Sequence, residues 1–169
     1  MTPRLYWIEG PWPGRLAISA RPRGGDWLED EVRGWRRVGI DVVVSLLSSE
    51  EEHDLELDRE SELSRAQGIR FVAFPIVDRS VPSSTAATVE LLKELRDELQ
   101  AGKTVAVHCR QGIGRSSLLA AGLLVTSGMS PGAAFSAIGS ARGLSVPETP
   151  EQQSWVELSL SNHLALVRE

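Results

Sequence analysis

The sequence has 169 residues, a length that suits one domain and allows a sizeable hydrophobic core. Its 18 basic and 23 acidic residues give a net charge of −5, which does not favour nucleic acid as a partner. No apolar stretch reaches transmembrane length, and the first residues lack the pattern of a signal peptide. A single cysteine excludes an internal disulfide, and no Cys/His cluster has metal-site spacing. We therefore expect one cytoplasmic domain over residues 1–169 that spans no membrane and needs no metal or cofactor.

The first part of the chain alternates short apolar segments with a helical one. Residues 6–8 and 16–19 are predicted strands on either side of a turn rich in glycine and proline. Asp26 is a candidate N-cap for a helix that runs to Arg37. Residues 41–47 form a continuous apolar run, which is typical of a central strand covered on both faces.

Several residues of this part have ordinary structural interpretations. The acidic run 50–52, capped by Ser48 or Ser49, is interpreted as a solvated face. His53 and His163 are interpreted as surface residues. The tryptophans crowded near the N-terminus are interpreted as a core patch: Trp7, Trp12, Trp27 and Trp35.

The middle of the chain continues the alternation. We expect a helix over 58–67 that ends at Gly68, followed by a strand over 69–74. A longer helix is predicted over 83–100, because leucines recur along one face of it. These leucines are Leu91, Leu92, Leu95 and Leu99.

The last part adds one strand and three helices. A strand over 105–107 leads to a helix over 115–127. Ser130-Pro131 and Thr149-Pro150 are helix start signals, for helices that run to about 142 and 167. Strands alternating with helices predict an α/β fold with a central, mostly parallel sheet flanked by helices. Such sheets bind ligands at the carboxyl ends of their strands.

The run 108–116 is the most informative part of the sequence. Cys109 follows a predicted strand, Arg115 comes after five further residues, and Gly112 and Gly114 lie between them. The helix N-terminus and loop N–H groups of such an arrangement stabilise a thiolate and can bind three phosphate oxygens. Glycines allow positive φ and close approach to a ligand, and an arginine fork binds two phosphate oxygens at once. The run therefore predicts phosphate binding against a thiolate.

Each residue of this run has an expected role. The phosphate-binding residues are predicted to be Arg110, Gln111, Gly112, Ile113, Gly114 and Arg115. Ser116 can donate a hydrogen bond to the sulfur and so make it a better leaving group. His108 is expected to hold the loop through hydrogen bonds and to tune the thiolate, rather than to act as a base. A buried free cysteine is the alternative interpretation, but it explains Cys109 alone. No Gly-Lys-Ser/Thr is present, which argues against a nucleotide-binding P-loop.

The Cys-x5-Arg spacing, with His before it and Ser after it, resembles the protein tyrosine phosphatase superfamily. The short chain is most similar to compact, atypical dual-specificity phosphatases. The resemblance implies a fold like theirs, with Cys109 as nucleophile and Arg115 as the residue that stabilises the transition state. It departs from classical members, because it has no phosphotyrosine-recognition loop and has Ile76-Val77-Asp78 in place of Trp-Pro-Asp. Gln111 and Ile113 stand where phosphoinositide-specific members carry lysines.

A phosphatase of this kind also needs an acid to protonate the leaving oxygen. Asp78 lies in the loop 75–82, after the predicted strand 69–74. We expect this strand to lie beside the one that leads to Cys109, so that both loops meet at one edge of the sheet. In the dual-specificity branch the acid lies about this far upstream, so the resemblance implies that Asp78 is the general acid. An ordinary turn aspartate is the alternative.

Two residues near the C-terminus leave alternatives open. The segment 148–153 resembles the one in which classical members carry a glutamine that positions the hydrolytic water, here Gln152. A helix cap at Thr149 explains the same pattern equally well. Arg142 either approaches the phosphate-binding loop or simply completes its helix.

Together these features predict a cysteine-dependent phosphomonoester hydrolase with a phosphocysteine intermediate. The expected substrate is a phosphorylated protein, carrying phosphotyrosine or also phosphoserine and phosphothreonine. The first alternative is a phosphate-recognition module with weak turnover. The second is an RNA 5′-phosphatase of the same superfamily, favoured only if Arg79 and Arg110 make the surface locally basic.

Overall fold

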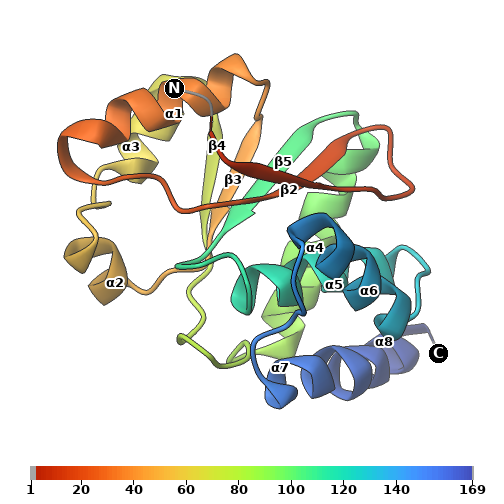
Figure 1. Ribbon diagram of the computed structural model, residues 1–169. Helices are drawn as coiled ribbons and strands as arrows, with labels where there is room; N and C mark the ends of the chain where they lie inside the picture. The colour runs from red at the N-terminus through yellow and green to blue at the C-terminus, as the bar shows by residue number, and fades with distance from the viewer. Residues whose placement is uncertain (1–2, 169) are drawn as a thin grey trace.

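The computed structural model describes residues 3–168, in which helices cover both faces of one five-stranded sheet (Figure 1). The strands are β1 (Leu5–Ile8), β2 (Arg15–Ser19), β3 (Val42–Ser45), β4 (Arg70–Ala73) and β5 (Thr104–His108). Their order across the sheet is β1-β2-β5-β3-β4. β1 pairs antiparallel with β2 and the other pairs are parallel, which confirms the predicted fold class. Of the domain expected over residues 1–169, positions 1, 2 and 169 lie outside the described residues.

Most helices lie where they were predicted, with small changes at their ends. Two differ more: residues 49–54 form a helix where only a capped acidic run was expected, and the helix expected from 150 to about 167 is divided by a π-helical segment. The helices are α1 (Leu28–Arg37), α2 (Ser49–Asp54), α3 (Glu60–Ala66), α4 (Thr85–Gln100), α5 (Arg115–Thr126), α6 (Pro131–Arg142), α7 (Pro150–Ser154) and α8 (Ser161–Arg168). A 3₁₀ turn (Gly25–Trp27) precedes α1, and a π-helical segment (Trp155–Leu160) joins α7 to α8. No helix among the described residues is long and apolar enough to cross a membrane.

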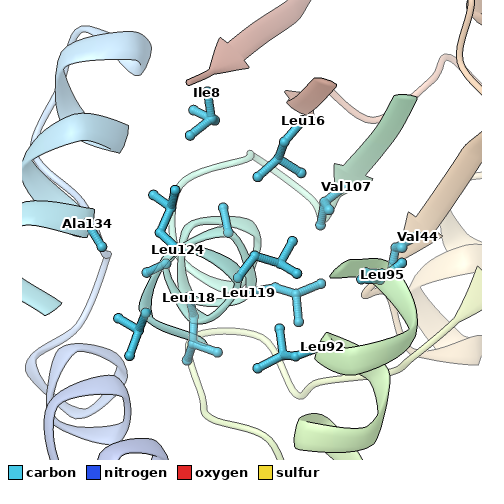
Figure 2. Close-up of a cluster of buried hydrophobic side chains, with 14 of the residues drawn as sticks. Ile8, Leu16, Val44, Leu92, Leu95, Val107, Leu118, Leu119, Leu124 and Ala134 are labelled. Atoms are coloured by element: carbon cyan, nitrogen blue, oxygen red, sulfur yellow. The ribbon is translucent and has the colours of Figure 1, made fainter. Parts of the chain in front are cut away.

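Alternation along the central strands divides the core between the two faces of the sheet. Val44 of β3 and Val107 of β5 point to the face covered by α4 and α5, where they pack with leucines of both helices (Figure 2). Val43 and Ala106, one residue earlier in each strand, belong to the core on the opposite face, under α1 and α3. α5 is buried along almost its whole length, which fixes the position of the loop that precedes it.

The expected neighbour of the Cys109 strand is wrong. β4 pairs with β3, and β3 lies between β4 and β5. The four residues of β3 are all buried, so this strand takes a central place and pairs on both edges. The carboxyl ends of these parallel strands nevertheless share one edge of the sheet, so the loop after β4 remains close to the loop after β5.

Two expectations for the start of α1 are also wrong. Asp26 lies inside the 3₁₀ turn and does not cap α1, whose N-cap residue Trp27 makes no side-chain capping bond. Trp27 is exposed and the guanidinium of Arg23 lies over its ring, so it does not belong to a core patch. Trp12 and Trp35 are buried, but they belong to the cores on opposite faces of the sheet, so the tryptophans do not form one patch.

Candidate active site

The loop 109–114, which we call the phosphate loop, joins the end of β5 to the start of α5. Gly112 has a φ of +71°, and its N–H donates to Cys109 Sγ at 3.2 Å. This left-handed conformation disfavours any residue with a Cβ. Cys109 is a free cysteine and is almost fully buried. The loop thus directs a backbone N–H group towards the sulfur of Cys109, the single cysteine of the sequence.

The phosphate loop forms the floor of a cavity of about 160 Å³. The cavity is lined by Asp78, Arg79, Cys109, Arg110, Gln111, Ile113, Gly114, Arg115 and Glu148. The structure therefore brings most of the predicted phosphate-binding residues to the same space as Cys109. Gly112 does not line the cavity and serves through its contact with the sulfur.

Arg115 is held in place by a dense set of acceptors. Its Nη1 donates to the carbonyl oxygens of Ile76 at 2.9 Å and Leu46 at 3.3 Å, which lie just after β4 and β3. Glu51 binds the same guanidinium through both carboxylate oxygens, at 2.7 Å to Nη1 and 2.9 Å to Nη2. Burial lowers the pKa of Arg115, but the bond to Glu51 and nearby negative charges raise it more, so this side chain stays positively charged.

Glu51 is the site residue that the sequence analysis missed. The acidic run was interpreted as a solvated face, and this is wrong for Glu51, whose side chain is 13% exposed. Ser48 and Glu51 form a capping box at the start of α2, which follows β3 at the carboxyl edge of the sheet. The available signal was the capping-box spacing of Ser48 and Glu51 directly after a predicted buried strand, whose carboxyl end is where such sheets bind ligands. Burial raises the pKa of Glu51, but Arg115 and Ser48 lower it more, and the net pKa is below its ordinary value.

Asp78 reaches the site although β4 is not adjacent to β5. Its Oδ1 lies 3.2 Å from Arg115 Nη2, and its side chain is half exposed at the cavity. We call residues 75–82 the Asp78 loop. Arg79, in a left-handed conformation with a φ of 63°, pairs with Glu148 at 2.7 Å across the rim of the cavity. This loop is thus linked to the segment before α7.

Gln152 and Arg142 both contact the loops of the site. Gln152 is buried and forms a capping box with Thr149, and its Nε2 donates to the carbonyl oxygen of Ser80 in the Asp78 loop at 3.1 Å. Both ends of the Gln152 amide are therefore bonded: Oε1 accepts from the backbone before α7, and Nε2 donates to the Asp78 loop. Arg142 approaches the phosphate loop and donates to the carbonyl oxygen of Gly112 at 2.8 Å.

Ser116 and His108 flank the loop in sequence and differ in their contacts. The Ser116 hydroxyl is buried and has no hydrogen-bond partner among the described residues, so its bond to the sulfur stays a prediction. His108 is fully buried; its Nδ1 faces the carbonyl oxygen of Cys109 at 3.4 Å and its Nε2 lies 2.5 Å from Glu60 Oε1. His108 thus contacts the backbone of the loop and not the sulfur.

Comparison with known families identifies this arrangement. A family model described as a DSP-PTPase phosphatase of polymorphic toxin systems matches residues 19–129, from the end of β2 to the residue before Ser130. The chain belongs to this phosphatase family. The matched part contains the phosphate loop, the Asp78 loop and Glu51. Among curated protein sequences no match was found.

Solved structures show how widely the fold of this phosphatase family is shared. The structure of kinase associated phosphatase with its catalytic-site cysteine replaced by serine is 22% identical, with a TM-score of 0.90, over 98% of this chain and 97% of that chain. The active form of Tk-PTP is 28% identical, with a TM-score of 0.75, over 96% and 99%. PTPMT1 in complex with PI(5)P is 20% identical, with a TM-score of 0.75, over 95% and 99%. Kinase associated phosphatase and PTPMT1, at 22% and 20% identity, are similar to this chain in fold.

Proposed function

We propose that this phosphatase hydrolyses phosphate monoesters through a covalent phosphocysteine on Cys109, with phosphorylated protein side chains as substrates. The observation that carries the proposal is the convergence of Cys109, Arg115 and Asp78 on one small cavity. A thiolate on a glycine-containing loop, a fixed guanidinium and a nearby carboxyl group are what this reaction needs.

In the first step the Cys109 thiolate attacks phosphorus, and the bond from phosphorus to the ester oxygen breaks. The leaving oxygen takes its proton from Asp78. The phosphate loop N–H groups and Arg115 bind the non-bridging oxygens, where charge is concentrated. Since these groups carry the charge, the proposed reaction needs no metal ion.

In the second step water attacks the phosphocysteine. Asp78, now a carboxylate, accepts a proton from this water as the oxygen bonds to phosphorus. The bond from sulfur to phosphorus breaks, which restores the thiolate and releases inorganic phosphate. The buried Ser116 hydroxyl lies just after Arg115 and is proposed to donate to the departing sulfur.

Arg115 is arranged to exchange one partner for the substrate. Glu51 and two backbone carbonyl oxygens occupy Nη1 and one position on Nη2, while Nε donates to no described residue. A phosphate dianion would use Nε and the Nη2 position that faces Asp78 in this structure. Substrate binding therefore displaces Asp78 from Arg115. Once it is away from that cation, the Asp78 carboxylate takes up a proton from solvent, and this is the proton that it gives to the leaving oxygen.

The proposal is tested by phosphate release from a panel of substrates, with Cys109→Ser as the control. The panel contains phosphotyrosine, phosphoserine and phosphothreonine peptides, PI(5)P and 5′-phosphorylated RNA. We expect turnover on phosphopeptides, and phosphate binding without turnover in Cys109→Ser, because a serine hydroxyl is not ionised by the loop. Turnover by Cys109→Ser comparable to the original chain would refute the nucleophile. Faster hydrolysis of lipid or RNA than of every peptide would refute the protein substrate.

A further inference from the structure

A buried acid–histidine pair lies directly behind the phosphate loop. Glu60 is the first residue of α3 and is 1% exposed, and His108, the last residue of β5, is 0% exposed. Glu60 Oε1 and His108 Nε2 are 2.5 Å apart. The His108 ring also stacks on Trp35, with ring centroids 5.9 Å apart. Neither the reaction proposed above nor the packing of the core accounts for a carboxylate in this place.

The surroundings of Glu60 indicate a charged partner. Its second oxygen, Oε2, is buried and accepts no hydrogen bond from a described residue. A carboxylate removed from water in this way is costly unless a cation lies beside it. The titratable groups that face His108 are Glu60 on α3 and Glu52 on α2, both acidic. α1 contributes the Trp35 ring, and Cys109 follows in the chain.

The other ring nitrogen of His108 points to the phosphate loop. Nδ1 lies 3.4 Å from the carbonyl oxygen of Cys109, and a carbonyl oxygen can only accept a hydrogen bond. A proton on Nδ1 together with a proton on Nε2 towards Glu60 makes the ring an imidazolium. Burial lowers the pKa of His108, but the charge of Glu60 and the hydrogen bond to it raise the pKa more, to a net value above the ordinary 6.5.

We propose that Glu60 is a positioning residue that holds His108 as an imidazolium against the backbone of Cys109, and thereby favours the Cys109 thiolate. The inference deepens the proposed function and rests on Cys109 as its nucleophile. Glu60 acts only through His108, since it does not line the cavity. The positive ring, one residue from the sulfur, favours the negative form of the thiol.

The first test measures alkylation of Cys109 by iodoacetamide as a function of pH in Glu60→Gln. Because the chain has one cysteine, every modified thiol is Cys109. We expect the midpoint of the profile to move up by on the order of one pH unit, since loss of a nearby opposite charge has effects of that size. The control is Glu62→Gln, on the same helix, whose side chain is 70% exposed. It should match the original chain.

A second measurement uses the original chain, so it does not depend on the folding of a variant. ¹⁵N NMR of the histidine ring should show both nitrogens of His108 protonated at pH 7, with His53→Asn and His163→Asn assigning the other two rings. A neutral His108 ring at pH 7 overturns the inference. So does an unshifted alkylation midpoint in folded Glu60→Gln.

The outcomes for this inference and for the proposed function are separable, because alkylation does not require turnover. An alkylation shift in Glu60→Gln, combined with no hydrolysis of any phosphate ester by the original chain, would support the role of Glu60 and overturn the proposed reaction. Hydrolysis that depends on Cys109, together with an unshifted midpoint, would overturn the role of Glu60 alone.

Discussion

At the level of single residues, Asp78 has two partners: Arg115 in this structure and, in the proposed reaction, the leaving oxygen of the substrate. Its carboxylate lies 3.2 Å from Arg115 Nη2, where the proposed reaction places a phosphate oxygen. The proposed reaction requires it to leave Arg115, take up a proton from solvent and give this proton to the ester oxygen. If Asp78 only shaped the turn, the loss of activity on replacing it would be the same for every leaving group.

We expect Asp78→Asn to impair hydrolysis of alkyl phosphates far more than hydrolysis of aryl phosphates with electron-poor leaving groups. An alkoxide needs a proton in the transition state, whereas a good phenoxide departs with little help. General acid catalysis contributes roughly 10²–10⁴-fold, and the loss on alkyl esters should fall in that range. Values of kcat/KM for matched substrates give the answer. Equal losses on both classes would assign Asp78 to the turn.

The bond between Glu51 and Arg115 gives stability a defined pH dependence. The pKa of Glu51 is below its ordinary value of 4.5 in the folded protein, so the pair contributes fully above pH 4.5. The contribution is lost as the pH falls through the lower, folded value. We expect Glu51→Gln to reduce the free energy of unfolding at pH 7 by about 1.5–3 kcal/mol, the range for hydrogen bonds to charged groups.

Urea unfolding of Glu51→Gln and of the original chain, at pH 7 and at acidic pH, checks this expectation. The difference in unfolding free energy between them should shrink as the pH falls below 4.5. Glu50→Gln, at an exposed neighbouring position, is the matched control and should change little. A difference that is constant with pH would mean that the charge of Glu51 is not the cause.

At the level of secondary-structure elements, the site is a turn held between a buried strand and a buried helix. β5 and α5 are both fixed by the core, so the six residues from Cys109 to Gly114 must close a set distance with a set direction. Gly112 closes it with a positive φ, and a Cβ there would lie 3.3 Å from the Ile18 side chain of β2. The backbone strain of any other residue would therefore act on the nucleophile.

We expect Gly112→Ala to lower the free energy of unfolding by about 1–2 kcal/mol, the cost of a left-handed conformation for a residue with a Cβ. Activity should fall as well, because the Gly112 N–H donates to the Cys109 sulfur. Gly132→Ala in α6 is the control: a Cβ there meets no atom within 4 Å. That variant should keep full activity. Thermal melts and kcat are measured on both variants. Losses in Gly112→Ala alone indicate strain at this position, whereas equal losses in both indicate a general sensitivity to Gly→Ala changes.

At the level of the whole molecule, parallel strands gather loops that are far apart in sequence at one edge of the sheet. The segments after β3, β4 and β5 supply Glu51, Asp78 and Cys109 in turn. This edge carries the only thiol in a chain of 169 residues, so no second cysteine can form a disulfide with it. Oxidation of a thiol is thereby confined to one atom.

We expect peroxide to inactivate the protein without forming an internal disulfide. A loop that favours the thiolate makes the sulfur easy to oxidise, and the products should be a sulfenic or higher acid, or a mixed disulfide when a small thiol is added. Mass spectrometry of the peptide that contains Cys109 identifies them and separates them from oxidation of methionine. A Cys109 that stays unmodified, under conditions that oxidise a free model thiol, would show that the thiolate is not favoured.

Short-range patterns in this sequence were enough to predict most of its secondary structure and the loop that holds Cys109 and Arg115. The spacing of Cys109 and Arg115, the cap at Thr149 and the leucine stripe of α4 all depend on neighbours a few residues apart, where chain geometry is nearly the same in every protein. The family resemblance was read from the same short run, and the family comparison confirmed it. Local spacing also indicated that Asp78 lies in a loop after a strand.

Tertiary structure alone decided which distant residues meet. Nothing within a few residues of β3 says that it lies between β4 and β5, because strand order depends on how all helices share the two faces of the sheet. Likewise, the partnerships of Glu51 with Arg115 and Glu60 with His108 join residues far apart in sequence. An acidic helix start looks like a solvated face until folding removes it from water. Burial then favours a cation beside the carboxylate, as Arg115 lies beside Glu51, and the proposed role of Glu60 beside His108 has the same physical basis.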